Sequence, residues 1–167
     1  MHRIAILTIS DRVSRGEAVD RSGEALVELV TSSGLGEVIA RDLVSDDIAQ
    51  IKRCVERWCG SGGDVIADLI LTTGGTGLSP RDVTPEAITP MLEKPAPNLM
   101  ELARYRCLET TPLAYLSRGV SGVIGQTLVI ALPGSPAGAV EQLSAILDIL
   151  PHAIDIATGK SDQHPPR

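Results

Sequence analysis

Aromatic side chains are almost absent from this chain of 167 residues. Phe does not occur, and aromatic residues make up 2% of the chain, although hydrophobic residues make up 43%. The core must therefore consist of Val, Ile, Leu and Ala, the residues that fill a parallel sheet covered by helices. A chain of this length forms one ordinary domain. We expect a single domain over residues 1–160 and a polar, disordered tail over residues 161–167.

The chain also lacks any concentration of positive charge. Lys and Arg number 15 against 21 Asp and Glu, which gives a net charge of −6, and no basic run occurs. This argues against nucleic-acid or membrane binding by charge. Cys54, Cys59 and Cys107 have neither metal-ligand spacing nor an even count, which favours free thiols in a reducing cytoplasm. Neither a signal-peptide pattern nor a membrane-length apolar run is found. We therefore expect a cytoplasmic protein with no nucleic-acid or membrane partner.

Short apolar runs alternate with segments of helical spacing. The runs at 4–9, 38–40, 69–71 and 127–132 predict buried strands. Since strand-to-strand crossovers through helices are right-handed, this order predicts an α/β fold. Its central sheet is doubly wound and mostly parallel, with helices on both faces. The glycine-rich bends from Gly119 to Gly125 predict a small β insertion of two short segments.

Each predicted strand ends in a polar or glycine-rich loop. The carboxyl ends of parallel strands lie at one edge of the sheet, so these loops should meet there. They are Ser10-Asp11, Asp46-Asp47, Gly74 to Asp82 and Pro133 to Pro136. Helix starts are also predicted: Ser22 and Thr84 are candidate N-caps, and Pro85 suits the first helical position. Pro90 predicts that the helix after Thr84 is short or kinked.

The stretch from Asp68 to Ala87, DLILTTGGTGLSPRDVTPEA, is the most informative. It contains neither a Walker motif nor a dinucleotide fingerprint, and GGTG alone is equally typical of a tight turn. Arg81 and Asp82 beside it favour an anion site. Backbone amides and threonine hydroxyls bind phosphate oxygens, and a carboxylate suits Mg²⁺ that bridges phosphates.

Other polar residues have simpler interpretations that stay open from the residues alone. Asp46 and Asp47 both suit helix capping, and Asp11 beside Arg12 fits a surface ion pair. The three histidines are scattered and predict no serine-histidine-carboxylate set. What remains is an inventory of carboxylates, glycine loops and hydroxyls, which is typical of phosphate handling with a divalent cation.

Five blocks in this order resemble the molybdenum-cofactor biosynthesis family that includes MogA, MoaB and the G domain of gephyrin. The resemblance covers nearly the whole chain. The blocks are ILTISD (Ile6 to Asp11), DRSG (Asp20 to Gly23), Asp68 to Ala87, TPLAYLSR (Thr111 to Arg118) and LPGSP (Leu132 to Pro136).

This resemblance implies a Mg²⁺-dependent molybdopterin adenylyltransferase. Such an enzyme converts ATP and molybdopterin to AMP-molybdopterin and pyrophosphate, and is typically a homotrimer that passes its product to a metal-insertion enzyme. The alternatives are a MoaB-like paralogue that binds a pterin without transferring AMP, and a scaffold module. The metal inserted downstream, molybdenum or tungsten, is left open.

Residue by residue, the resemblance places two carboxylates in catalysis and in Mg²⁺ binding, Asp82 and Asp46. Whether Asp46 or Asp47 faces the site stays open. With the neighbouring strand-end loops, the expected substrate-binding residues are Ser10, Asp11, Thr73, Gly74, Gly75, Thr76, Gly77, Arg81, Ser117, Pro133, Gly134 and Ser135.

Overall fold

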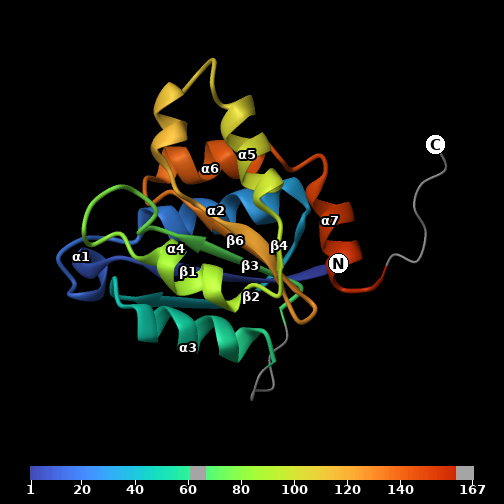
Figure 1. Cartoon of the computed structure of the whole chain (residues 1–167), viewed down its shortest axis with the longest axis horizontal. Helices are drawn as coiled ribbons and strands as arrows, with labels where there is room; N and C mark the ends of the chain where they lie inside the picture. Colours follow the sequence, from blue (N-terminus) through green and yellow to red (C-terminus); the bar gives the residue numbers. More distant parts are fainter. Residues whose placement is uncertain (61–66, 161–167) are drawn as a thin grey trace.

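The computed structural model describes residues 1–60 and 67–160. The predicted tail at 161–167 lies outside these ranges. Within them, six strands form one sheet in the order β2-β1-β3-β6-β5-β4 (Figure 1). β2 (Gly36–Val44), β1 (His2–Ile9), β3 (Leu69–Thr73) and β6 (Thr127–Leu132) are parallel. β5 (Ser121–Ile124) and β4 (Lys94–Pro95) continue the sheet in antiparallel pairing.

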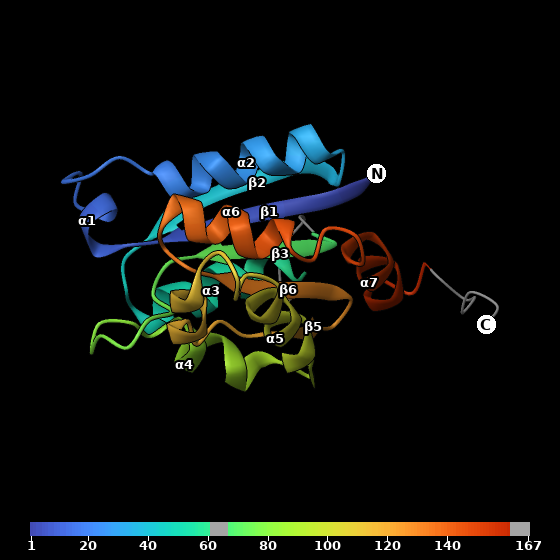
Figure 2. The ribbon, with the colours of Figure 1, turned by 90° about the horizontal axis from the view of Figure 1, so that it is seen from above.

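Helices cover both faces of this sheet, which confirms the doubly wound fold (Figures 1 and 2). On one face lie α2 (Arg21–Ser33), α5 (Pro97–Arg106), α6 (Pro136–Ser144) and α7 (Leu150–Ala157), and on the other lie α3 (Ile48–Trp58) and α4 (Thr84–Ile88). Alternate residues of each strand enter opposite cores, as the period of two requires. Ile4 and Ile6 of β1 pack under α2, whereas Ala5 and Leu7 pack with α3.

The small β insertion differs from its prediction. The glycine-rich bends form one strand, β5, rather than two, and its partners are β6 and the two-residue edge strand β4. Short elements complete the fold: α1 (Asp11–Ser14), and the 3₁₀ helices η1 (Thr89–Met91) and η2 (Pro112–Leu116). As Pro90 predicts, α4 ends early, at Ile88.

Two predicted helix caps are wrong, each for a physical reason. Asp20 caps α2 by accepting a hydrogen bond from Gly23 N at 2.9 Å, and Ser22 lies buried in the first turn instead. Thr84 is already inside α4, and its hydroxyl donates to the carbonyl of Gly74 at 2.8 Å. Short-range spacing encodes neither the burial of Ser22 nor the contact of Thr84 with the glycine loop.

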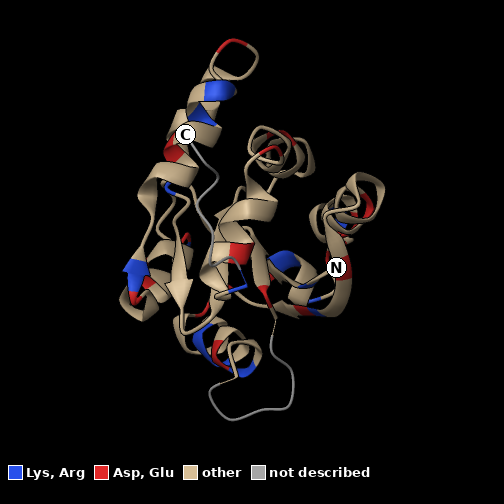
Figure 3. Ribbon diagram, turned by 90° about the vertical axis from the view of Figure 1, so that its right-hand side faces the viewer, with Lys and Arg blue, Asp and Glu red and all other residues tan. Residues whose placement is uncertain are grey.

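Charges of both signs are interspersed along the ribbon (Figure 3). In this view the Lys and Arg residues of the described ranges are not gathered on a separate basic face that could attract a polyanion. Among the helices of the described residues, none has both the length and the apolar character needed to span a bilayer.

Asp68 connects β1 to β3 at the amino ends of these strands, opposite the strand-end loops. Its side chain is 2% exposed, and it accepts hydrogen bonds from Arg3 N at 2.8 Å and Arg3 Nη2 at 3.0 Å. Lys160 Nζ lies 3.1 Å from the same carboxylate. Burial by itself raises the pKa of Asp68, but the hydrogen bonds from Arg3 and Lys160 outweigh it and lower the pKa to about 2.

We predict that Asp68→Asn lowers the free energy of unfolding at pH 7 by roughly 1 to 2 kcal/mol, since Arg3 is half exposed. The folded-state pKa lies below the unfolded value of about 3.9. The carboxylate therefore stabilises the fold fully above that value, and its contribution is lost between about pH 4 and pH 2. Urea unfolding of both proteins at pH 7, 4 and 3 measures the difference.

The control is Asp148→Asn, which removes an exposed ion pair with Arg106 and should leave stability nearly unchanged. If Asp68→Asn lowered the free energy of unfolding as much at pH 3 as at pH 7, the stabilising role assigned to the charge would be contradicted.

Candidate functional site

Two adjoining hollows lie where β1, β2, β3 and β6 end. Their volumes are about 390 Å³ and about 360 Å³. Gly75, Asp82 and Gly134 line both hollows and so form a common wall between them. The strand-end loops therefore meet at one edge of the sheet, as the sequence predicts.

The larger hollow, called here the apolar hollow, lies between the glycine loop, η2 and α6. Leu113, Ala114 and Leu116 supply its apolar lining, and Thr76 and Ser117 supply hydroxyls that lie 3.1 Å apart. The remaining lining residues are Gly77, Thr111, Pro133, Ser135, Gly138, Glu141 and Gln142.

The smaller hollow, called here the polar hollow, lies between the loops after β1 and β2 and the start of α2. Ser10, Asp20 and Asp46 give it hydroxyl and carboxylate groups. Asp20 Oδ2 also accepts from Thr8 Oγ1 at 2.8 Å, which fixes the carboxylate against β1. The remaining lining residues are Thr8, Ile9, Val13, Val19, Arg21, Ser22, Gly74 and Pro136.

The glycine loop passes too close to its neighbours to carry side chains. Gly74 has φ 108°, and a Cβ there would lie 2.0 Å from the carbonyl oxygen of Ile9. Gly75 has φ 63°, and its Cβ would lie 2.4 Å from Thr84 Oγ1 and 3.0 Å from Asp46 Oδ1. Only glycine fits this path, which brings loop backbone beside a carboxylate of the polar hollow.

Asp11 and Asp46 tie the loops after β1 and β2 to each other. Asp46 Oδ2 accepts from Asp11 N at 2.9 Å, and Asp11 Oδ1 accepts from Asp46 N at 3.1 Å. Arg81 donates to Asp11 Oδ2 through Nε at 2.9 Å and Nη2 at 2.5 Å. Asp11 thus pairs with Arg81, across the sheet edge, rather than with Arg12 as sequence adjacency suggests.

The two carboxyl groups differ in their pKa shifts. The hydrogen bond from Arg81, followed by that from Asp46 N, lowers the pKa of Asp11. Burial raises the pKa of Asp46, and the nearby charges of Asp11 and Asp82 act in the same direction, which outweighs the hydrogen bond from Asp11 N. Asp46 is therefore a carboxylate whose negative charge lacks full compensation by the protein.

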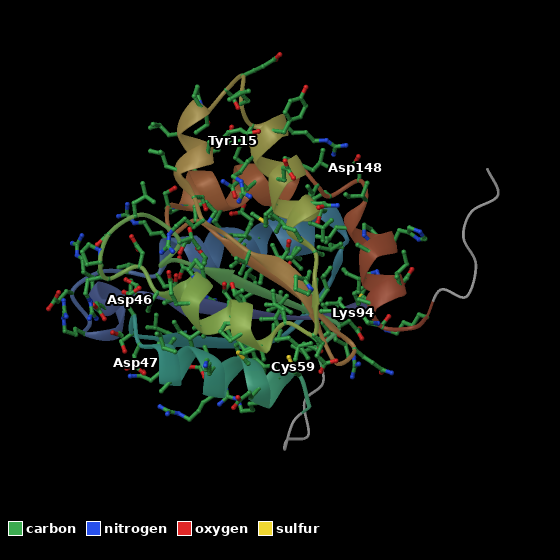
Figure 4. The ribbon with its side chains drawn as sticks, viewed as in Figure 1. Asp46, Asp47, Cys59, Lys94, Tyr115 and Asp148 are labelled. Atoms are coloured by element: carbon green, nitrogen blue, oxygen red, sulfur yellow. The ribbon has the colours of Figure 1, made fainter. Side chains whose placement is uncertain are left out.

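Asp46, and not Asp47, faces the polar hollow. Asp47 Oδ1 accepts from Gln50 N at 2.8 Å and caps α3, is exposed, and lines neither hollow. Figure 4 shows Asp46 beside α1 and Asp47 at the start of α3. The sequence leaves open which of the two carboxylates faces the site. Asp47 is used to cap α3, and Asp46 faces the polar hollow.

Asp82 lies on the common wall, held by its own turn. Its Oδ2 accepts from Ser79 N at 2.8 Å, and its backbone N donates to Ser79 O at 2.9 Å. Across the described residues, no group of three or more His, Cys, Asp or Glu side chains is placed to hold a metal. Two carboxylates, Asp46 and Asp82, nevertheless fit Mg²⁺, which is commonly held by one or two carboxylates together with substrate phosphates.

Most of the sequence-predicted site residues line the hollows, but three do not. Thr73 is buried, and its hydroxyl donates to Pro133 O at 2.7 Å, so it joins β3 to β6. Asp11 and Arg81 form the ion pair described above and line neither hollow. Those that do line a hollow are Ser10, Asp46, Gly74, Gly75, Thr76, Gly77, Asp82, Ser117, Pro133, Gly134 and Ser135.

Several lining residues are missing from the sequence prediction. Asp20 lies in the DRSG block, and its carboxylate is the feature of that block that could have marked it as a site residue. Gln142 is 2% exposed and its Oε1 has no hydrogen-bond partner, but it lies within the apolar pattern of α6 and gives no signal of its own. Leu113 and Leu116 read as ordinary apolar residues.

Comparisons with known proteins identify the family of the chain. The family model described as "Probable molybdopterin binding domain" matches residues 5–152. Molybdopterin adenylyltransferase of Helicobacter pylori is 37% identical over 93% of this chain and 88% of its own length. Gephyrin of Dictyostelium discoideum is 38% identical over 94% of this chain, which spans only 23% of gephyrin.

Solved structures show the same relationship. The molybdopterin biosynthesis enzyme MoaB of Thermus thermophilus matches with a TM-score of 0.89 and 48% identity, over 98% of this chain and 100% of that chain. With its family model, its relatives and its fold in agreement, the chain belongs to the MogA/MoaB family of molybdenum-cofactor biosynthesis, whose domain is described as molybdopterin-binding.

Proposed function

We propose that the chain is a molybdopterin adenylyltransferase that transfers AMP from ATP to molybdopterin. The observation that carries this proposal is the pair of hollows with Asp82 on their common wall. A reaction between two polyanions needs two adjoining sites whose ends meet at one point. The name of the Helicobacter relative, which this chain matches over most of its length, supports the same reaction.

The hollows suit the two halves of such a reaction. Both volumes fall in the range of roughly 300 to 1,000 Å³ that is typical of small-molecule sites. The apolar lining of Leu113, Ala114 and Leu116 suits a planar heterocycle, such as a pterin or an adenine. Amides of the glycine loop and the hydroxyls of Ser117 and Ser135 suit phosphate oxygens. The phosphates would then lie along the common wall.

The chemistry needs no general base. A terminal phosphate oxygen of molybdopterin attacks the α-phosphorus of ATP, the bond to the bridging oxygen breaks, and its electron pair leaves with pyrophosphate. A phosphate monoester loses its second proton with a pKa of about 6, so the nucleophile is already ionised near neutral pH. In agreement with this, none of the described residues that line the two hollows is a histidine. Catalysis then depends on alignment and charge stabilisation.

Asp46 and Asp82 are the residues that would hold Mg²⁺. When bound, the ion supplies positive charge that neutralises phosphate oxygens. Asp46 has a raised pKa because its burial and the neighbouring carboxylates oppose its charge. A divalent cation relieves that repulsion.

The wider proposal follows the family resemblance. The protein acts in the cytoplasm as a homotrimer and passes AMP-molybdopterin to a metal-insertion enzyme. Exposed apolar side chains support self-association: Leu113 is 72%, Leu116 54% and Tyr115 47% exposed, and Figure 4 places Tyr115 on the projecting tip formed by α5 and η2. Exposed apolar side chains that lie close together in the chain are typical of interaction sites.

We predict that the protein, incubated with ATP, Mg²⁺ and molybdopterin, releases pyrophosphate and forms AMP-molybdopterin. Chelation with EDTA should abolish the release, and added Mg²⁺ should restore it. Pyrophosphate is measured by a coupled assay, and the product by mass spectrometry.

The second candidate is a MoaB-like protein that binds the pterin without transferring AMP. The 48% identity to the Thermus MoaB favours it. Calorimetry that shows molybdopterin binding, together with no pyrophosphate above a no-enzyme blank, would establish this candidate and exclude adenylyl transfer.

We predict that Asp82→Asn lowers kcat by at least about 100-fold, as expected for loss of a charged group that acts on the reacting phosphates. Molybdopterin affinity should change by less than about threefold, because the amide keeps the shape of the wall. Asp148→Asn, on the surface away from the hollows, is the control. Turnover that stays within threefold of wild type would remove Asp82 from the mechanism.

The neighbouring carboxylates provide a matched pair. Asp46→Asn should raise the Mg²⁺ concentration needed for half-maximal turnover by about 10-fold or more, because it removes a charged ligand. Asp47→Asn should behave like wild type, since asparagine is an equally good N-cap. The measurement is a Mg²⁺ titration of pyrophosphate release. Equal effects of the two substitutions would contradict the distinction between them.

A further inference from the structure

Arg118 contacts three parts of the segment that carries Asp82. Its Nε donates to Gly77 O at 2.8 Å, and its Nη2 donates to Asp82 O at 2.8 Å. Its Nη1 donates to Glu86 Oε1 at 2.5 Å, and its backbone N donates to Thr76 O at 2.7 Å. One side chain therefore connects the glycine loop, the backbone of Asp82 and α4.

The segment between Gly75 and Asp82 is also restrained by the turn from Ser79 to Asp82 and by the pairing of Arg81 with Asp11. Leu78 is 70% exposed, and no helix or strand occurs between Thr73 and Thr84. Within it, the Asp82 carboxylate lies against Gly77, since a Cβ on Gly77 would be 2.8 Å from Asp82 Oδ2. The guanidinium binds the carbonyls of both of these residues. It therefore fixes the distance between Gly77 and Asp82. The position of the Asp82 carboxylate depends on that distance.

The backbone on both sides of Arg118 is held by hydrogen bonds from Arg104. Arg104 of α5 donates through Nη1 to Gly119 O at 3.2 Å and to Ser117 O at 3.4 Å. The planar guanidinium of Arg118 presents its donors in a fixed fork, which a lysine cannot reproduce. The hydrogen bond from Arg118 lowers the pKa of Glu86, so the partner carboxylate stays ionised.

Two observations separate Arg118 from a substrate-binding residue. It lines neither hollow, although its neighbour Ser117 does. Its positive charge is matched by Glu86 in an ion pair, so little of that charge is available to phosphates in the hollows. Arg118 thus acts on the site through the loop.

We propose that Arg118, oriented by Glu86, is the positioning residue that holds Asp82 at the wall between the two hollows. The proposal rests on the proposed function for its kinetic consequence, but the loop geometry is testable without it. A misplacement of about 1 Å in a catalytic group costs on the order of 100-fold in rate. Loss of the fork should therefore lower kcat, while KM, which reports binding of the distant heterocycles, changes much less.

The test uses Arg118→Lys and Arg118→Ala in the full chain, with Arg106→Lys as the matched control. Arg106 also binds a backbone carbonyl and a carboxylate, Ala145 O and Asp148, but away from the hollows. Hydrogen exchange of peptides covering residues 74–83 reports the loop. We expect these peptides to exchange at least about 10-fold faster than wild type in both Arg118 variants. In the control variant, Arg106→Lys, they should exchange at the wild-type rate. Exchange equal to wild type in both variants would overturn the proposal.

Kinetics provide the second readout. Arg118→Lys should lower kcat by about 10- to 100-fold with KM changed by less than about threefold. Millimolar methylguanidinium should restore part of the lost kcat to Arg118→Ala, because it supplies the missing donors; it should not affect Arg106→Lys. Unchanged kcat in Arg118→Lys, despite faster loop exchange, would show that the clamp does not position Asp82.

A failure of the proposed function has a different signature, since wild type then releases no pyrophosphate. In that case hydrogen exchange of residues 74–83 decides, because it requires no turnover. Faster exchange in Arg118→Lys, with wild-type exchange in Arg106→Lys, supports the Arg118 clamp. Equal exchange in all three proteins overturns it.

Discussion

The close approach of Gly74 to the end of β1 is the constraint on which the site depends. Gly74 N donates to Leu132 O at 3.1 Å, and Gly74 O accepts from Thr84 Oγ1. With a Cβ excluded by Ile9 O, this one residue joins β1, β3 and β6 to the start of α4. Gly75 then necessarily passes beside Asp46, and the chain reaches Asp82 at the wall of both hollows. A side chain at residue 74 would displace all of these together.

The electrostatics of the site follow from the same crowding. The proposed reaction joins two polyanions, and an acidic chain needs local hydrogen-bond donors to bind them. Burial, followed by the nearby charges of Asp11 and Asp82, raises the pKa of Asp46, whereas the hydrogen bond from Arg81 lowers the pKa of Asp11. Arg81 thus pairs with Asp11, whereas the carboxylates of Asp46 and Asp82 accept hydrogen bonds only from backbone amides among the described residues. This is the arrangement in which a divalent cation and phosphates gain most by binding together.

The sequence predicts those features that depend on short-range pattern. The strands β1, β3 and β6, the meeting of their loops and the place of Asp82 follow from apolar periodicity and from topology. The contacts of individual side chains do not. Arg81 adjoins Asp82 but pairs with Asp11, 70 residues away, and Thr84 turns its hydroxyl to Gly74 rather than to its own helix. Arg118 likewise lies next to a predicted site residue, but its role depends on three acceptors brought close by tertiary structure.

The division into two hollows follows from the order of the sheet. The polar hollow is built by loops that follow β1 and β2, from the parallel half. The apolar hollow takes its apolar wall from η2, part of the segment inserted between β3 and β6 that also forms the antiparallel edge strands. Asp82 lies at the start of this insertion, immediately before α4. The point where the chain leaves the parallel half for the insertion is thus the point where the two hollows meet. A residue there faces both hollows because of the chain's path. The contacts of Arg118 tie a later part of the insertion back to it.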